Sequence, residues 1–358
     1  LASTDKLLAG LTDVAGSTSA AEADLNKGAE GSLPEQTVTV DQIKTSATPE
    51  PTATSAPTEP PADSAAGETT TEPTAAPTEA PQPDNSGTGE TINVTMNGTA
   101  QTMDLVQCLA MVAQNELGPN APAEAYKAQC VATHCWIISQ SGYPSVLGAE
   151  PGAAALAAAQ EVAHVLVTYN GQVCFTPYFA SASTGTASAA EVWGNDRAWL
   201  QAVDSPYDQS VSSHWNTNGN SSGTARFSRQ TLQDRIRDVM DIDLSGVDPN
   251  SWFTIQSANQ YGWVAKIQVG PDASVGTVSG RWFRENLLAR QSVDGRSLRS
   301  QCFTVSYNAD LDCFIFDVYG YGHGCGMSQW GAIGYARNGW GYQDILTHYF
   351  VGTTITTY

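Results

Sequence analysis

Apolar residues follow a helical period in the first long segment after residue 100. Leu105, Leu109 and Val112 stand at i, i+4 and i+7, so they share the face of a predicted helix that turns toward the core. Glu116 stands at i+11 on that face, where the helix ends. Burial and the negative end of a helix dipole both raise the pKa of a carboxyl group, which favours a general acid near neutral pH. The alternatives are an outward-pointing Glu116 where the helix frays, or an ion pair with Lys127.

The remaining patterns predict helices and strands that come in blocks. Predicted helices cover residues 104–117, 122–140, 152–164, 228–240, 328–338 and 342–350. Predicted strands cover residues 91–96 with a partner after the Asn97-Gly98 turn, 165–169, 173–182, 253–256, 264–269 and the hairpin 302–318, which turns at 308–311. Blocks of helices and strands, rather than strict alternation, predict an α+β fold.

Composition separates the first 90 residues from the rest of the chain. Residues 45–90 hold nine of the eighteen prolines and eight acidic residues, with no Lys or Arg. A tract so poor in apolar residues cannot repay the entropy of ordering, so an extended spacer is predicted there. Residues 1–44 are small and polar, and they are also predicted to be disordered. The expected organisation is therefore a disordered segment 1–44, a spacer 45–90 and one globular domain 91–358.

The charge limits the possible partners. The formal net charge is −20, of which −12 falls in residues 1–90 and −8 in residues 91–358. Because neither part has a basic face, nucleic acid is not an expected partner. No run of about 18 apolar residues occurs, so no membrane span is predicted. The chain begins with Leu, which suggests a mature form whose export signal or membrane anchor was removed, and a spacer before a domain is typical of a tethered bacterial surface protein.

Six glycines crowd the segment from Gly320 to Gly334, with His323, Ser328, Gln329 and Trp330 between them. Glycine loses more backbone entropy on folding than any other residue, so this density predicts a tight loop where main chain approaches another surface closely. The polar and aromatic side chains beside the loop are expected to be exposed, as on a surface that binds carbohydrate or peptide. A Gly-Lys-Ser/Thr sequel is missing, which excludes a phosphate loop.

The run Gly-His-Gly-Cys-Gly-Met-Ser-Gln-Trp-Gly-Ala at 322–332 resembles the signature of the stage II sporulation protein D and amidase-enhancer (SpoIID/LytB) family, which acts on bacterial cell wall. Other segments match in family order and cover most of residues 104–352: 112–119, 123–132, 178–185, 191–194, 203–206, 280–284 and 298–305. The resemblance implies that paired N-terminal helices pack with antiparallel β-sheet lobes in the α+β domain and form a glycan-binding groove. Two positions depart from the family, since His134 replaces an Arg and Ala180 replaces a His.

The resemblance also implies a reaction, the cleavage of peptidoglycan glycan strands by a lytic transglycosylase. Glu116 matches the family's catalytic acid, which forms 1,6-anhydromuramic ends without a second carboxylate. An ordinary hydrolase would need a second carboxylate at about 5–9 Å, for which Glu191, Asp196 and Asp204 are candidates. The alternative from another class is a non-catalytic wall-binding protein that enhances a partner amidase.

A set of polar and aromatic residues is predicted to bind the substrate around Glu116: Lys127, Gln129, Tyr178, Ser181, Ser183, Arg299, His323, Gln329 and Trp330. Lys127 and Gln129 match family positions in the second helix. Tyr178, Ser181 and Ser183 are expected to share one face of a strand. Each of these residues has a structural alternative. Tyr178, Ser181 and Ser183 could form an ordinary polar face of a sheet, and His323 could bond to main chain. Arg299 could form an ion pair, and Trp330 could belong to the core.

Cysteine and histidine suggest a metal only weakly. Cys130 and His134 share a helix face, and a zinc site there would need further ligands such as Cys135, His164 or Cys174. The chain has no Cys-x2-Cys pair, and the interval 141–152 lacks the zinc-binding Cys/His loop of some family members. Neither zinc nor another cofactor is therefore expected. The number of cysteines, seven, is odd, and most are expected to be buried thiols.

Overall fold

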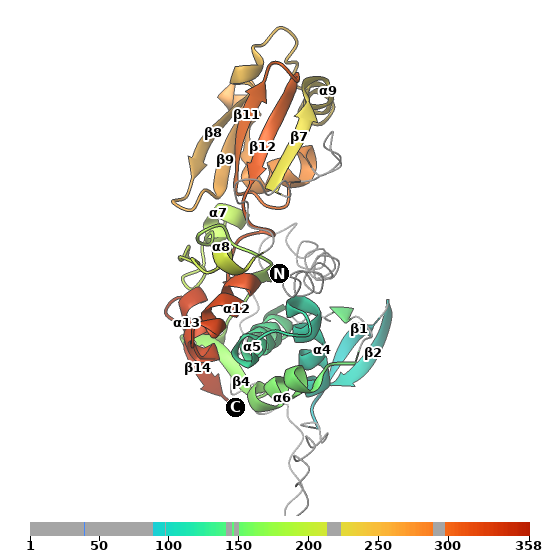
Figure 1. The fold of residues 1–358 in the computed structure, drawn as a ribbon, viewed down its shortest axis with the longest axis vertical. Coiled ribbons are helices and arrows are strands. Elements are labelled where there is room, and N and C mark those ends of the chain that lie inside the picture. The colour runs from blue at the N-terminus through green and yellow to red at the C-terminus, as the bar shows by residue number, and fades with distance from the viewer. Residues whose placement is uncertain are drawn as a thin grey trace, which may run out of the picture.

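The computed structural model describes Thr39 and residues 89–96, 98–140, 145–146, 150–212, 223–288 and 298–358. These residues form an α+β fold with two lobes, each around its own hydrophobic core (Figure 1). The sheet lobe comprises the described residues of 224–288 and 298–318, and the helical lobe holds the rest of the described fold. Nearly all of the predicted tail 1–44 and spacer 45–90 lies outside the described residues, as does Asn97. Thr39 forms an isolated antiparallel bridge with Gln172.

The helical lobe contains helices packed with short strands. The helices are α4 (Leu105–Leu117), α5 (Ala123–Gln140), α6 (Ala153–Val162), α7 (Ala189–Trp193), α8 (Asp208–Val211), α12 (Gln329–Arg337) and α13 (Tyr342–Tyr349). The strands are β1 (Thr91–Met96), β2 (Thr99–Asp104), β3 (Ser145–Val146), β4 (Val165–Tyr169), β5 (Gln172–Val173), β6 (Tyr178–Phe179), β13 (Met327–Ser328) and β14 (Thr354–Thr357). They pair as sheets β2-β1-β3, β14-β4-β5 and β13-β6.

The sheet lobe contains two antiparallel three-stranded sheets, β10-β9-β8 and β11-β12-β7. Their strands are β7 (Thr224–Ser228), β8 (Phe253–Ala258), β9 (Val264–Val269), β10 (Thr277–Ser279), β11 (Phe303–Asn308) and β12 (Cys313–Val318). The helices are α9 (Arg229–Met240), α10 (Ala273–Gly276), α11 (Gly280–Trp282), the 3-10 turn η3 (Pro249–Ser251) and the π-helical turn η4 (Phe283–Leu287). Figure 1 shows this lobe above the helical lobe, with α9 along one side of the strands.

The predicted helix that carries Glu116 is confirmed as α4. Asp104 caps its first turn by accepting a hydrogen bond from the backbone N–H of Gln107 at 3.1 Å. Gly118 ends it with a φ of 80°, a conformation that glycine adopts without steric cost. The apolar stripe that predicted this helix is buried, so the periodicity identified the correct face.

Two strand predictions are wrong. The segment 173–182 is not one strand: β5 ends at Val173 and β6 covers only Tyr178–Phe179. Pro177 has no backbone N–H to donate to a ladder, which explains the interruption. The 302–318 hairpin turns one residue later than predicted, because Asn308 pairs with Cys313. All seven cysteines are buried free thiols, as expected for most of them.

Candidate active site

Glu116 ends the buried face of α4 and faces the first residue of α12. Its side chain is 7% exposed. Its Oε2 accepts a hydrogen bond from Nε2 of Gln329 at 2.7 Å. Lys127 does not pair with Glu116, because its ammonium binds Glu124 at 2.9 Å and Glu161 at 2.7 Å. The structure thus joins the predicted catalytic carboxylate to the glycine-rich segment.

The glycine loop, Gly320–Gly326, packs tightly against the protein itself. Gly320, Gly322, Gly324 and Gly326 all have φ between 72° and 110°, in the left-handed region. A Cβ at Gly326 would collide with the carbonyl oxygen of Pro177. The predicted close approach is therefore confirmed. The predicted exposure of its neighbours is wrong, since four of them are buried: His323, Ser328, Gln329 and Trp330.

Asp208 holds the start of α12 in place. It is fully buried, and its Oδ1 accepts hydrogen bonds from Ser328 at 2.6 Å, Ser181 at 3.1 Å and the Ala182 backbone at 2.8 Å. Its Oδ2 accepts one from Ser205 at 2.6 Å. Sequence reasoning missed Asp208, because its local pattern is that of a solvated turn and three of its four donors come from two distant segments, Ser181–Ala182 and Ser328.

His323 is a neutral structural residue. Its Nδ1 accepts a hydrogen bond from the backbone N–H of Cys325 at 3.2 Å, so Nε2 carries the proton and donates to the carbonyl of Tyr178 at 3.0 Å. Burial lowers the pKa of His323 to about 3, against the opposite effect of the Tyr178 carbonyl. It cannot act as an acid near neutral pH, and it fastens the glycine loop to β6.

Tyr178 connects Glu116 to α5. Burial raises the pKa of the Tyr178 phenol, the nearby Glu116 carboxylate raises it further, and a hydrogen bond with Thr133 opposes both. Gln129 lies one helical turn before Thr133 and donates to its hydroxyl at 3.3 Å, while its own Oε1 is buried and has no hydrogen-bond partner among the described residues. A row of buried polar groups therefore leads from Glu116 into the second helix.

The other predicted binding residues do not share one face. Ser181 points to Asp208, whereas the hydroxyl of Ser183 donates to the carbonyl of Tyr261 at 2.8 Å. These two serines therefore do not share a strand face with Tyr178, which corrects that prediction. The guanidinium of Arg299 lies 5.4 Å from the ring centre of Tyr321.

The candidate second carboxylates have other surroundings. Glu191 belongs to a capping box at the start of α7, where Oε2 accepts hydrogen bonds from the Ser188 backbone at 2.8 Å and from Asn259 at 3.0 Å. Asp196 is exposed and accepts from Gln201. Asp204 is also exposed. Glu191 is therefore committed to holding α7, and the other two are solvated.

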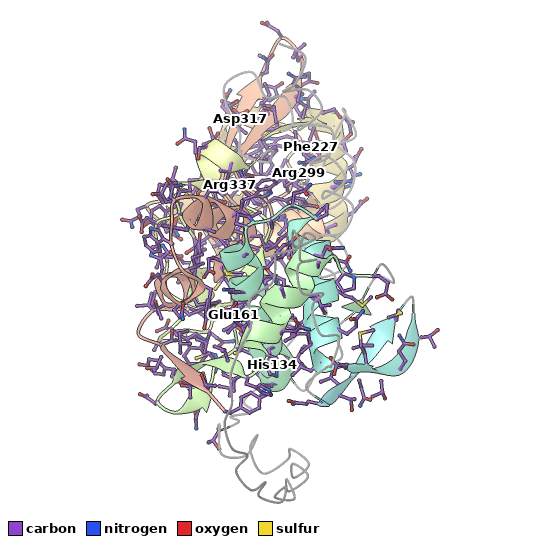
Figure 2. All side chains as sticks on the ribbon, turned by 60° about the horizontal axis from the view of Figure 1, so that its bottom comes forward. His134, Glu161, Phe227, Arg299, Asp317 and Arg337 are labelled. Atoms are coloured by element: carbon purple, nitrogen blue, oxygen red, sulfur yellow. The ribbon has the colours of Figure 1, made fainter. Side chains whose placement is uncertain are left out.

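The candidate metal ligands Cys130, His134, Cys135, His164 and Cys174 lie in the helical lobe. Within the described residues, no group of three or more His, Cys, Asp and Glu side chains could hold an ion. Burial lowers the pKa of His134 to about 4, which keeps it neutral beside Tyr358 and His164. Figure 2 shows His134 in the helical lobe. No described helix has the length and apolar character to cross a membrane.

No family model matches the chain. Known proteins of two kinds are similar to it, an amidase enhancer and stage II sporulation protein D. The chain is 24% identical to the amidase enhancer of Bacillus subtilis (strain 168), over 69% of this chain and 40% of that protein. It is 24% identical to stage II sporulation protein D of the same strain and of Bacillus amyloliquefaciens, each over 53% of this chain. The chain spans less than half the length of these curated relatives.

Proposed function

Because this chain is related to the SpoIID/LytB family, we propose that its helical lobe cleaves the glycan strands of peptidoglycan as a lytic transglycosylase. One observation carries the proposal: the almost buried carboxylate of Glu116 is held by Gln329 from the family's glycine-rich signature. A carboxyl group shielded from water and held by a neutral donor suits proton transfer in both directions.

The reaction needs one residue and no water. The protonated carboxyl of Glu116 gives its proton to the glycosidic oxygen while the bond from the anomeric carbon to that oxygen breaks. That anomeric carbon belongs to a muramic acid residue of the glycan strand. The resulting carboxylate of Glu116 then takes the proton of the 6-hydroxyl of this muramic acid. That oxygen bonds to the anomeric carbon and closes a 1,6-anhydro ring, so Glu116 regains its proton. The commitment of Glu191 to the α7 capping box favours this scheme over hydrolysis with a second carboxylate.

The proposed substrate, peptidoglycan, implies where in the cell the domain acts. Peptidoglycan lies outside the cytoplasmic membrane, so we place the domain outside the cytoplasm, at the cell surface or in the cell wall. This proposal includes a groove beside Glu116 that admits a glycan strand.

A second function has its own support. One relative is named an amidase enhancer, so the same domain could bind the cell wall without cutting it and stimulate a partner amidase. His134 and Ala180, which replace family residues, favour this alternative. The two functions differ in whether Glu116 transfers a proton.

The test is digestion of purified glycan strands whose stem peptides have been removed. We expect the wild-type protein to release fragments with 1,6-anhydromuramic ends, and Glu116→Gln to lose at least about 1,000-fold of this activity because it cannot supply a proton. Glu150→Gln is the control, because Glu150 is an exposed carboxylate bonded to Gln107. Mass spectrometry identifies the ends, since anhydro ends lack the water that hydrolysis adds.

Other results would redirect the assignment. Full activity in Glu116→Gln would exclude this residue as the acid. Intact strands combined with stimulation of an added amidase by both wild type and Glu116→Gln would establish the enhancer instead.

A further inference from the structure

Gln329 lies where it can act on Glu116 without touching the substrate. Its side chain is 3% exposed, and its amide nitrogen is used in the 2.7 Å bond to Oε2 of Glu116. The two residues are 213 positions apart in the chain, so tertiary structure alone brings them together. This geometry differs from the direct substrate contact that the sequence suggested.

Several interactions fix the backbone on both sides of Gln329. The residue before it, Ser328, caps α12 by accepting from the Gly331 backbone at 3.1 Å and donates to Asp208 at 2.6 Å. The Trp330 backbone N–H donates to the carbonyl of Ala180 at 3.0 Å. The first turn of α12 is thus bonded on both sides of Gln329. The backbone that carries its side chain is therefore held in place independently of Glu116.

A neutral amide has a particular effect on a carboxyl group. Its N–H stabilises the ionised form, yet unlike Lys or Arg it brings no full charge that would keep the acid permanently ionised. Because Oε2 of Glu116 accepts this N–H, the acidic proton belongs on Oε1. The donor therefore decides which oxygen offers the proton.

We propose that Gln329 is a positioning residue for Glu116. It fixes the rotamer of the carboxyl group, assigns the proton to Oε1 and limits the proton affinity of the acid. Its consequence for catalysis rests on the proposed function above. Its effect on the carboxyl group does not depend on whether the chain cleaves glycan.

Three variants test this role. Gln329→Leu removes the donor at similar size, and Gln329→Glu keeps the shape but replaces the donor with a second carboxyl group. Gln301→Leu is the matched control, because Gln301 is also fully buried and donates its amide nitrogen, at 3.2 Å, to the Val264 carbonyl. Carbon NMR of protein labelled in its glutamate side chains follows the titration, and the spectrum of Glu116→Gln identifies the Glu116 signal.

The expected result is a change in proton affinity confined to the Gln329 variants. Loss of the donor should raise the proton affinity of Glu116 about tenfold, and Gln329→Glu should raise it further by adding a like charge. With stripped glycan, the basic limb of the pH–rate profile should move to higher pH, with kcat lowered and KM nearly unchanged. Gln301→Leu should leave both the titration and the profile as in the wild type.

The outcomes distinguish this proposal from the proposed function. An unchanged Glu116 titration in both Gln329 variants would overturn the positioning role. A raised KM with an unchanged pH profile would also overturn it, because that result identifies a substrate contact. If the wild type leaves glycan intact while the titration shifts as expected, the proposed reaction fails and the positioning role stands.

Discussion

At the scale of single residues, Asp208 is the buried carboxylate that organises the helical lobe. Its four donors come from the chain near Ser181, from Ser205 and from Ser328. Burial of an ionised carboxylate is costly, and hydrogen bonds to the charged form repay only part of the cost. Burial accordingly raises the pKa of Asp208 to about 6, against these hydrogen bonds.

This shift predicts a pH-dependent stability. The folded protein binds the Asp208 proton more tightly than the unfolded chain, whose carboxyl has a pKa of 3.8. The stabilisation is therefore complete below about pH 4 and is lost as the pH rises through about 6, a change of about 3 kcal/mol. We expect the free energy of unfolding of the wild type, relative to Asp208→Asn, to fall by this amount between pH 4 and pH 7. Chemical denaturation at several pH values measures it, and a constant difference would refute the assignment.

For Glu116, local sequence predicted the buried face of the helix but not the residue that bonds to its carboxylate. The helical period was sufficient to place it on the buried face of α4, because that face is set by residues a few positions away. Helical periodicity could not predict the hydrogen-bond partner of Glu116. The bond to Gln329 depends on how α12 packs against α4, and no spacing in the chain encodes that contact.

At the scale of elements, the long helices of the helical lobe were predicted well, whereas its short helices α7 and α8 were missed and its short strands were predicted poorly. Helices α4, α5, α12 and α13 lie within a residue or two of their predicted bounds, because periodicity and stop signals are local. Strands β6 and β13 are two residues each and pair in parallel across about 150 positions. Such pairs leave almost no pattern in the sequence. The same long-range packing buries the glycine loop.

The N-terminus of α12 gives a prediction about an element. Ser328→Ala removes a helix cap and one donor to the buried Asp208 carboxylate, so it should cost about 2–4 kcal/mol of unfolding free energy. Ser228→Ala is the matched control, because Ser228 caps α9 by accepting from the Thr231 backbone at 3.1 Å but reaches no buried charge. Its expected cost is about 1 kcal/mol.

Urea denaturation of the two variants at the same pH measures this difference. Equal losses in both would show that the Asp208 contact adds nothing to the cap. A loss of glycan cleavage in Ser328→Ala at a temperature where it stays folded would connect the cap to the position of Gln329.

At the scale of the whole molecule, one tryptophan joins the two lobes. Trp263 precedes β9 of the sheet lobe, yet it is fully buried in the core of the helical lobe. Its indole N–H donates to the carbonyl of Gly185 at 2.8 Å, and its ring meets that of Phe179 edge-on at 5.9 Å. A Cβ at Gly324 of the glycine loop would collide with the same ring. The hydrophobic pattern indicated buried residues but could not assign them to two cores.

Trp263 should therefore couple the stability of the lobes. Trp263→Ala should cost about 3–5 kcal/mol and speed hydrogen exchange in both the glycine loop and the sheet lobe. Trp252→Ala provides the comparison, because Trp252 is just as buried but stacks on Phe314 inside the sheet-lobe core. Its loss should speed exchange only in residues 224–318.

Peptide-resolved hydrogen–deuterium exchange separates these outcomes. If Trp263→Ala speeds exchange in the helical lobe alone, the stabilities of the two lobes are not coupled through Trp263, and this residue only packs in the helical-lobe core. If both variants speed exchange everywhere, the chain unfolds as one unit without a specific joint. If Trp263→Ala speeds exchange in both lobes and Trp252→Ala in the sheet lobe alone, the sheet lobe supports the glycine loop through Trp263, because Gly324 of that loop packs directly on the Trp263 ring. The loop leads into α12, whose first residue, Gln329, donates to Glu116.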